Sequence, residues 1–336
     1  MMINKTTIIA EIGVNHNGSV KKAFNLVKAA KKSGADIAKF QYFNAERLVS
    51  QKAKKAPYQL KNKNDKEKQF KLLKPLEISI KNLLKIKSFC KKNNIGFMIS
   101  VFDETGIKAI NKLKTKIIKI PSGEINNYIL LKLLGKSKKK IILSTGMSNF
   151  KEIKRAIDVL VKNGNSKKKI TLLQCNSCYP SPIEDSNLNV INEYKKRFDV
   201  NVGYSDHTQG IESSLAAVAL GAKIIEKHFT LNKNAKGPDH SSSLNPKQFS
   251  QLVQSIRKVE KCLGNKVKKI SQSEKQNFKL VRKSIVANSL IQKGKKFNLK
   301  NITFKRPAGG LGPEKVKSVI GRIAKKNFEK DEFIKL

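Results

Sequence analysis

Short runs of β-branched and apolar residues alternate along the chain with longer stretches in which apolar residues recur every three or four positions. The runs are typical of buried strands, and the longer stretches are typical of amphipathic helices. Several helical stretches are followed at once by glycine, a common helix stop. The eight predicted strands are residues 7–12, 37–42, 95–102, 117–120, 141–144, 170–175, 200–204 and 222–226, and the helical stretches include 20–33, 78–93, 150–163, 211–220 and 246–263.

Repeated strand–helix units favour a (β/α)8 TIM barrel, with a doubly wound open sheet as the alternative because local pattern does not show closure. The barrel is expected over residues 1–264, followed by a polar linker at 265–283 and a small β-rich domain at 284–336. A domain that small is marginally stable alone, so we expect it to dock on something. Residues 44–75, rich in Lys and Asn, are a long insertion and therefore either a partly ordered lid or a disordered loop.

Composition changes this picture little. The 336 residues carry a net charge of +45, which is typical of proteins that bind nucleic acid or membranes. The lysines, however, are spread along the whole chain without an Arg-rich helix or zinc-finger spacing, so we favour codon bias and solvated lysines over a nucleic-acid surface. No run of 18 apolar residues and no hydrophobic leader is present, which predicts a soluble cytoplasmic protein without a membrane partner.

The four cysteines do not suggest a disulfide framework in a chain of this length. Cys175 and Cys178 have the CxxC spacing of some metal and redox sites. A second cysteine pair of that spacing is missing from the sequence, which argues against zinc.

Two histidines lie where apolar runs stop, in the strings Gly-Tyr-Ser-Asp-His-Thr and Ile-Ile-Glu-Lys-His-Phe-Thr. Ser205 precedes His207 by two positions and Glu226 precedes His228 by two, so each pair shares one face of a strand. At neighbouring strand ends of a barrel, His207 and His228 could bind a divalent cation and leave positions open for substrate and water. An acid–base role for His207 without metal remains the alternative.

Other polar residues mark the same predicted rim. Lys39 and Lys119 end apolar strands, where a buried charge is costly without an anion. With nearby hydroxyls they suit a small dianion such as a phosphorylated carboxylate. Candidate acid–base or metal-supporting groups are Glu11, Glu124 and Glu226, and Asp239 lies in the loop that overhangs the barrel mouth. His16 and His240 could belong to the site or be loop residues bonded to backbone.

A set of motifs, in order over nearly the whole chain, resembles the sialic acid synthase family. They are Ala-Glu-Ile-Gly-Val-Asn-His-Asn-Gly at 10–18, Lys-Phe-Gln at 39–41, Ile-Pro-Ser-Gly-Glu at 120–124, Leu-Ser-Thr-Gly-Met at 143–147 and the two histidine strings. Phe-Lys-Arg-Pro at 304–307 is similar to the family's C-terminal antifreeze-like (SAF, β-clip) domain.

The resemblance implies a transferase that condenses phosphoenolpyruvate with the open-chain aldehyde of N-acetylmannosamine, forming N-acetylneuraminate and releasing phosphate. Mn²⁺ or Mg²⁺ on His207 and His228 would polarise the aldehyde, with Glu226 supporting the metal. The residues implied for phosphoenolpyruvate are Lys39, Lys119, Ser122, Ser144 and Ser205. Those implied for the sugar and the attacking water are Glu11, Gln41, Glu124, Tyr179 and Asp239.

In the family, the small domain reaches across a domain-swapped homodimer and places an arginine, here Arg306, over the partner's barrel. Two positions differ from the family pattern. Ser177, preceded by Asn176, lies where some members have Asn, and Ser100 replaces a usual Thr near the third strand's end. The first difference leaves the sugar open, and both leave the reaction intact.

Two other functions remain open. The sugar could be a 2,4-diacetamido-trideoxyhexose, leading to N,N'-diacetyllegionaminate or pseudaminate. Alternatively, the barrel could be inactive and bind polyanions or carbohydrate through its charge. Against this second possibility stands the rim itself, because a binding protein has no need for Glu124, His207 and His228 together.

Overall fold

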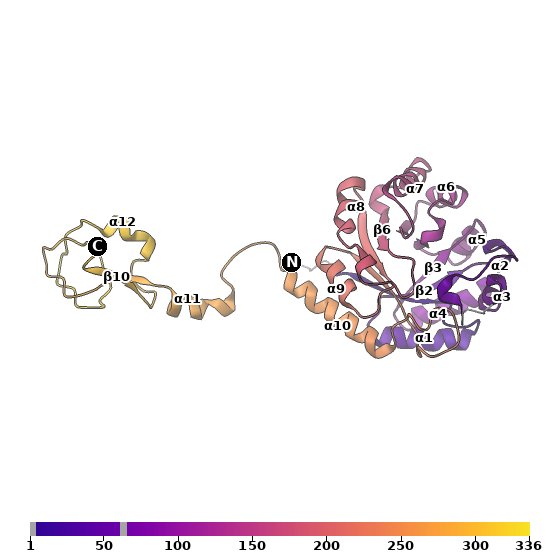
Figure 1. Ribbon diagram of the computed structural model, residues 1–336, viewed down its shortest axis with the longest axis horizontal. Coiled ribbons are helices and arrows are strands. Elements are labelled where there is room, and N and C mark those ends of the chain that lie inside the picture. The colour runs from indigo at the N-terminus through magenta and orange to yellow at the C-terminus, as the bar shows by residue number, and fades with distance from the viewer. Residues whose placement is uncertain (1–4, 61–65) are drawn as a thin grey trace. The chain divides into compact units, whose positions relative to one another are not determined.

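The computed structural model describes residues 5–60 and 66–336. The chain divides into two compact units, one ending at Gly264 and the other beginning at Asn265. Figure 1 shows the first unit as strands surrounded by helices and the second as a smaller, mostly irregular unit.

The first unit is a closed barrel of eight parallel strands in chain order, and β8 pairs back with β1. Closure confirms the TIM barrel and excludes the open, doubly wound sheet. All predicted strands are present, with ends shifted by at most a few residues. They are β1 (Thr7–Gly13), β2 (Ile37–Tyr42), β3 (Gly96–Val101), β4 (Ile117–Ile120), β5 (Lys140–Ser144), β6 (Ile170–Cys175), β7 (Asn201–Asp206) and β8 (Ile224–His228).

Helices cover the outside of the barrel and bury their apolar faces against it. Polar caps set several helix starts: Ser19, Asn149 and Asn245 accept backbone N–H groups of the first turn. The larger helices are α1 (Val20–Lys32), α4 (Ile80–Lys92), α5 (Thr105–Lys112), α6 (Tyr128–Lys136), α7 (Phe150–Lys162), α8 (Val190–Phe198), α9 (Glu212–Ala219) and α10 (Pro246–Leu263).

A small apolar cluster fills the barrel interior. Ile9, Met98, Ile142 and Leu173 come from β1, β3, β5 and β6 and are all buried. Each precedes by two positions a residue at a strand's carboxyl end, namely Glu11, Ser100, Ser144 and Cys175. Because side chains alternate with period two, the cluster forms an apolar floor beneath the polar strand ends.

The described parts of the 44–75 insertion are folded. They contain α2 (Ala45–Leu48), α3 (Gln69–Leu73) and the 3₁₀ turns Pro57–Gln59 and Lys74–Leu76. Leu73 and Leu76 pack with Val14 and Phe43 in a separate apolar cluster. The described residues therefore fit the ordered interpretation rather than disorder. The rest of the insertion, 61–65, lies outside the described residues.

The second unit is built on an antiparallel pair, β9 (Ser284–Ala287) and β10 (Ile302–Lys305), with the short helix α12 (Val316–Val319). Its core includes Ile285, Phe297 and Phe328.

The segment expected to be a linker, 265–283, is not wholly irregular. It contains α11 (Lys275–Val281), which follows a turn capped by Ser271. The carbonyl of Lys279 accepts the N–H of Ala308 at 2.9 Å, so this helix belongs to the small unit. The sequence pattern did not predict this helix because seven residues carry too few apolar positions to show a period.

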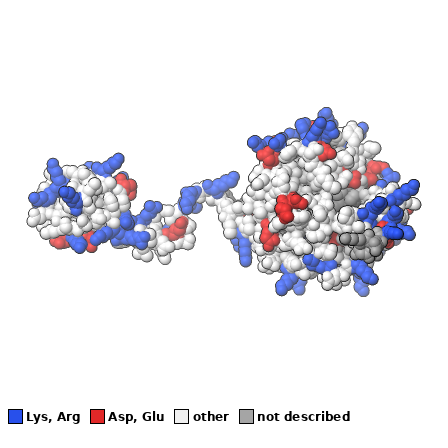
Figure 2. All heavy atoms as spheres, in the orientation of Figure 1, with Lys and Arg blue, Asp and Glu red and all other residues white. Residues whose placement is uncertain are grey.

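Basic side chains are scattered over both units on the face shown in Figure 2, with uncharged surface between them. They do not gather into one stripe there, which agrees with solvated lysines. Within the described ranges, no helix is long and apolar enough to cross a membrane.

Candidate active site

An ion cluster lies inside the barrel where its strands end. The Lys119 ammonium, on β4, donates to Glu226 Oε1, on β8, at 2.6 Å. Lys39, on β2, lies 2.6 Å from Glu11 Oε2 and 3.6 Å from Glu226 Oε1. All four side chains are at most 5% exposed. Two hydroxyls complete the cluster: Ser100 accepts from Lys39 at 2.9 Å, and Ser205 donates to Glu226 at 3.1 Å.

The charges in this cluster depend on one another. Burial alone would raise the pKa of Glu226, but the positive charges of Lys119 and Lys39 outweigh it and lower that pKa to about 2. Burial lowers the pKa of Lys119, and Glu226 partly opposes this. The carboxylates of Glu11 and Glu226 thus compensate the charges of the two buried lysines. The protein itself therefore supplies negative charge that these lysines were expected to need. A dianionic ligand would meet two ammonium groups already aimed into the barrel.

His207 and His228 face each other beside this cluster, with ring centroids 5.5 Å apart. His207 Nδ1 lies 2.5 Å from the backbone oxygen of Asn176. A carbonyl can only accept, so Nδ1 carries a proton, and the lone pair of the neutral form of this ring is on Nε2. His228 Nδ1 is buried, and none of the residues that the structure describes forms a hydrogen bond with it. Burial, then the charge on His207, holds the pKa of His228 well below its usual value, so this ring is neutral.

These two rings fit the chemistry of metal ligands. A ligating histidine is neutral and commonly donates its other ring N–H to a carbonyl, as His207 does. The unpartnered nitrogen of His228 is a second available donor. Within residues 5–60 and 66–336, however, no group of three or more His, Cys, Asp or Glu side chains is arranged around one metal position. The protein thus offers two ligands, and a cation there would need further ones from substrate and water.

Three polar side chains meet around Gly13, where a register shift ends β1. Gln41 donates to Glu11 Oε1 at 3.0 Å, and Asp239 Oδ2 is 3.8 Å from His228 Nδ1. Gly13 has φ +53°, and a Cβ there would come within 3.1–3.3 Å of Gln41, Glu11 and Asp239. Glycine is needed at this point both for its backbone conformation and for the space. Burial, then the nearby Glu11 charge, raises the pKa of Asp239 to about 7.

Hydroxyls line the other side of the mouth. Ser122 accepts the N–H of Gly146 at 3.0 Å, and the Ser177 hydroxyl lies so close to Gly146 that a Cβ there would clash with it. Ser144 Oγ is buried and has no hydrogen-bond partner among the described residues, so it could bond a ligand. Glu124 lies in the turn after β4 and accepts from Asn127 at 2.7 Å.

The loop after β6 bends over the histidines. Tyr179 places its ring 4.1 Å from that of His207 and 5.7 Å from that of His228. The side chain of Asn176 is occupied locally, because its Oδ1 accepts the N–H of Cys178 at 2.8 Å. Cys175 is buried and Cys178 exposed, and both are free thiols.

Some predicted residues lie elsewhere or have other partners. Arg306 follows β10 in the second unit and is exposed. His16 is fully buried, and its Nδ1 accepts from Gly18 N. His240 Nδ1 is 2.7 Å from the Thr230 hydroxyl. His16 is thus a loop residue bonded to backbone, whereas the bonds of His240 are to side chains, and a role of either histidine in the site stays a prediction.

Sequence reasoning missed two features of this end of the barrel. Asp206 and Lys227 form a buried ion pair of 2.9 Å between β7 and β8, each one residue out of phase with a histidine. A charge next to each histidine on the opposite strand face was the available signal. The other feature is Tyr58, whose ring lies 4.7 Å from that of Tyr179. Nothing local marked it, since the contact depends on how the insertion folds.

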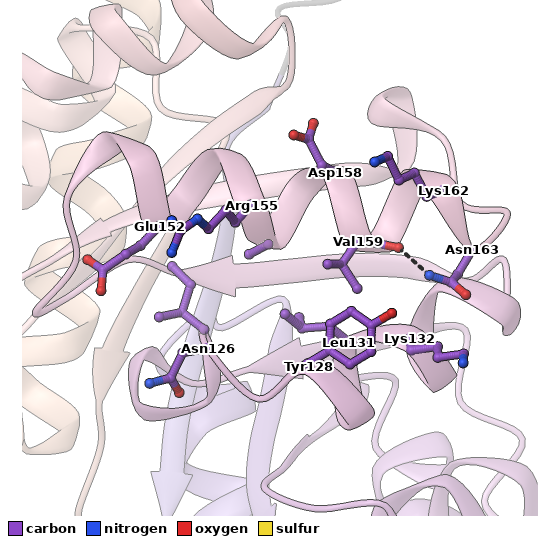
Figure 3. Close-up of a pocket in the computed structure, with 12 residues that line it drawn as sticks. Asn126, Tyr128, Leu131, Lys132, Glu152, Arg155, Asp158, Val159, Lys162 and Asn163 are labelled. Atoms are coloured by element: carbon purple, nitrogen blue, oxygen red, sulfur yellow. Dashed lines mark hydrogen bonds between the residues drawn. The ribbon is translucent and has the colours of Figure 1, made fainter.

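A cavity of 810 Å³ lies between α6 and α7 on the outside of the barrel (Figure 3). Tyr128 and Leu131 of α6 face Arg155 and Val159 of α7 across it. It contains none of the predicted site residues, so the candidate active site remains the barrel mouth.

Comparisons with known proteins agree with this geometry. The family model described as NeuB family matches residues 26–268, and the SAF domain model matches residues 282–336. N,N'-diacetyllegionaminic acid synthase of Campylobacter jejuni is 49% identical over 99% of this chain and 100% of its own length. The enzyme of the same name from Legionella pneumophila is 41% identical over 94% of this chain and 89% of its own.

A solved structure is also similar. N-acetylneuraminic acid synthetase from Leptospira borgpetersenii, in complex with citrate, is 33% identical with a TM-score of 0.72, covering 82% of this chain and 90% of that one. The barrel with its polar mouth, the small C-terminal unit and these matches together show that the chain belongs to the NeuB family of synthases and ends in a SAF domain.

Proposed function

We propose that this protein is an N,N'-diacetyllegionaminate synthase, which condenses phosphoenolpyruvate with a 2,4-diacetamido-trideoxyhexose. The observation that carries the choice of sugar is the 49% identity, over the full length of both chains, to an enzyme named for that product. The solved structure named for N-acetylneuraminic acid is 33% identical. This favours the diacetamido sugar over N-acetylmannosamine, which remains the substrate to compare it with.

The lysines and hydroxyls bind phosphoenolpyruvate in this proposal. Lys39 and Lys119 point into the barrel from β2 and β4, and the Ser144 hydroxyl has no partner in the described part of the chain. Charge-assisted bonds to a buried dianion are strong, and they would replace part of the contact with Glu226. Ser122 and Ser205 lie at the same strand ends and complete this group.

The histidine side of the mouth would receive the aldehyde. His207 and His228 would hold Mn²⁺ or Mg²⁺, which supplies a Lewis acid for the aldehyde oxygen. Carbon 3 of phosphoenolpyruvate forms the new bond to the aldehyde carbon, and the aldehyde oxygen takes a proton. Water adds at carbon 2 and loses its protons as the bond from carbon 2 to the phosphate oxygen breaks, giving the keto acid and phosphate. Asp239, whose Oδ2 is 3.8 Å from His228 Nδ1, and Glu11, which lies with it beside Gly13, are carboxyl groups that could move these protons.

Phosphate release with paired sugars tests this proposal. Purified protein with phosphoenolpyruvate and Mn²⁺ should release phosphate with 2,4-diacetamido-trideoxymannose, at a kcat/KM well above that for N-acetylmannosamine. Equal or higher kcat/KM with N-acetylmannosamine would contradict the choice of sugar. Omitting the sugar is the control for simple hydrolysis of phosphoenolpyruvate.

A further inference from the structure

Tyr58 lies at the barrel mouth although it belongs to the insertion after β2. Its ring centroid is 4.7 Å from that of Tyr179, and the Tyr179 ring is 4.1 Å from His207. Burial, then the charge of Asp239, raises the pKa of the Tyr58 hydroxyl, which places this side chain within electrostatic reach of Asp239. Tyr58 therefore adjoins the side of the mouth to which the proposed function assigns the sugar.

The insertion presents this ring from a folded turn. Gln59 Oε1 accepts from the N–H of Ala56 and from the side chain of Gln69, both at 3.0 Å. The N–H of Gln69 donates to the carbonyl of Ala53 at 3.1 Å, next to an antiparallel bridge between Lys54 and Lys68. These bonds join the two described sides of the insertion at the turn. The position of Tyr58 is thus determined by structure around it and not by a freely rotating loop.

A cavity of 760 Å³ lies on the other side of Tyr58. Its walls come from the insertion, from the loop after β1 and from the loop after β8, which also carries Asp239. Apolar side chains make up much of the lining, and they include Leu60, Leu72, Pro75, Leu76 and Pro238. Two residues of the lining thus adjoin the mouth: Tyr58 contacts Tyr179, and Pro238 precedes Asp239 in the chain.

We propose that Tyr58 is a specificity-determining residue that contacts the end of the sugar far from the aldehyde and favours an acylamino or methyl substituent there over a hydroxyl. This rests on the proposed function, which places the aldehyde beside the histidines. A sugar extending outward passes Tyr179 and reaches Tyr58 and the cavity. An apolar wall gains by covering a methyl group, whereas a hydroxyl pressed against it loses its bonds to water without replacement.

Kinetics with two sugars test the proposal. Tyr58→Ala should lower kcat/KM for 2,4-diacetamido-trideoxymannose by about tenfold or more. Under the same conditions kcat/KM for N-acetylmannosamine should change by less than about threefold, because that sugar has hydroxyls at its far end. Tyr58→Phe keeps the apolar face and should behave like the unaltered protein with both sugars. KM for phosphoenolpyruvate should not change.

Tyr128→Ala is the matched control, since Tyr128 is a 58% exposed tyrosine of α6, beside the outer cavity of Figure 3. It should leave both kcat/KM values unchanged. Equal losses with both sugars in Tyr58→Ala, or no loss with either, would overturn the specificity role while leaving the proposed function intact. Failure of the unaltered protein to release phosphate with any sugar would overturn the proposed function and this inference together. Thermal unfolding of each variant separates these results from misfolding.

Discussion

At the scale of single residues, the notable feature is a carboxylate shared by two lysines. Glu226 on β8 contacts Lys119 on β4, across the barrel, and lies close to Lys39 on β2. The sequence could predict that these lysines end buried strands, because that is a local property. It could not predict their partner, because β4 and β8 approach each other only when the barrel closes. The predicted role of Glu226, supporting the metal, remains untested beside this observed pairing.

Removing Lys119 should weaken phosphoenolpyruvate binding. In Lys119→Met, the ligand loses one ammonium and Glu226 loses its shortest ion pair. We expect KM for phosphoenolpyruvate to rise by about 30-fold or more, with a smaller effect on KM for the sugar. Lys140→Met is the matched control: Lys140 is an exposed lysine at the opposite, amino end of neighbouring β5. Unchanged KM for phosphoenolpyruvate in Lys119→Met would show that Lys119 does not bind it.

Phosphate release should depend on a divalent metal, and replacing His228 should raise the metal concentration that it requires. Chelation of the unaltered protein should abolish phosphate release, and Mn²⁺ or Mg²⁺ should restore it. His228→Ala removes a neutral buried imidazole, so about 100-fold more metal should be needed for half-maximal activity. Activity that survives exhaustive chelation would instead favour the metal-free role considered for His207. Phosphoenolpyruvate binding, followed by calorimetry, serves as the control for an intact site.

At the scale of elements, the adjacent strands β7 and β8 place candidate site residues on one face and a buried ion pair on the other. Ser205, His207, Glu226 and His228 point to the inside of the barrel mouth, while the alternate residues Asp206 and Lys227 form a buried ion pair. Lys227 also donates to the carbonyl of Thr208 at 2.6 Å, and Asp206 accepts from Ser214 at 2.5 Å. These bonds join the ends of β7 and β8 directly behind the two histidines.

Breaking this pair should therefore cost both stability and metal affinity. Lys227→Met leaves Asp206 buried without its counter-ion, which should lower the free energy of unfolding by about 3–5 kcal/mol. The double variant Asp206→Asn/Lys227→Met, in which both charges are gone, should lose less.

Urea unfolding measures the change in stability, and metal titration of phosphate release measures the change in affinity. Lys5→Met is the surface control, because Lys5 is 61% exposed in its pair with Asp36 and should cost under about 1 kcal/mol. An equally small loss in Lys227→Met would show that the buried pair does not stabilise the strand ends.

Elements also differ in how well their sequence reveals them. The eight strands were predictable because each is an apolar run bounded by turns. The polar residues at their carboxyl ends were therefore predictable as neighbours, while their role as the site stays a prediction. The structure of the insertion was harder to predict. Side-chain bonds between the two described sides of the insertion hold Tyr58 beside Tyr179, and no periodic sequence pattern encodes such bonds. The helix α11 was missed because it is short and lies among polar residues.

At the scale of the whole molecule, the chain contains two units. The barrel holds the candidate site, and the structure of the barrel does not explain what the SAF domain does. Arg306 is exposed and directly follows β10. The family resemblance led us to expect a domain-swapped homodimer in which this arginine covers the partner's barrel. That arrangement stays a prediction, because it depends on a second copy of the chain.

Mixing two impaired variants tests that prediction, at a metal concentration too low for His228→Ala to be active. Arg306→Ala should lower activity without changing the unfolding temperature, whereas Arg322→Ala, at another exposed arginine of the same domain, should not. If the arginine acts across a homodimer, subunits of Arg306→Ala reassembled with those of His228→Ala should regain about a quarter of full activity, since half of the dimers then contain one complete site. No recovery on mixing, with each variant well folded, would place Arg306 on its own barrel or outside the site.

The central claim is that the barrel mouth joins phosphoenolpyruvate to an amino sugar, and product analysis tests it most directly. Purified protein with Mn²⁺, phosphoenolpyruvate and 2,4-diacetamido-trideoxymannose should yield phosphate and a nine-carbon keto acid in equal amounts. A phosphate assay measures the first product, and mass spectrometry measures the second. Omission of either substrate should stop both products. Phosphate formed without the keto acid, or no phosphate with any N-acylated hexosamine, would contradict the account.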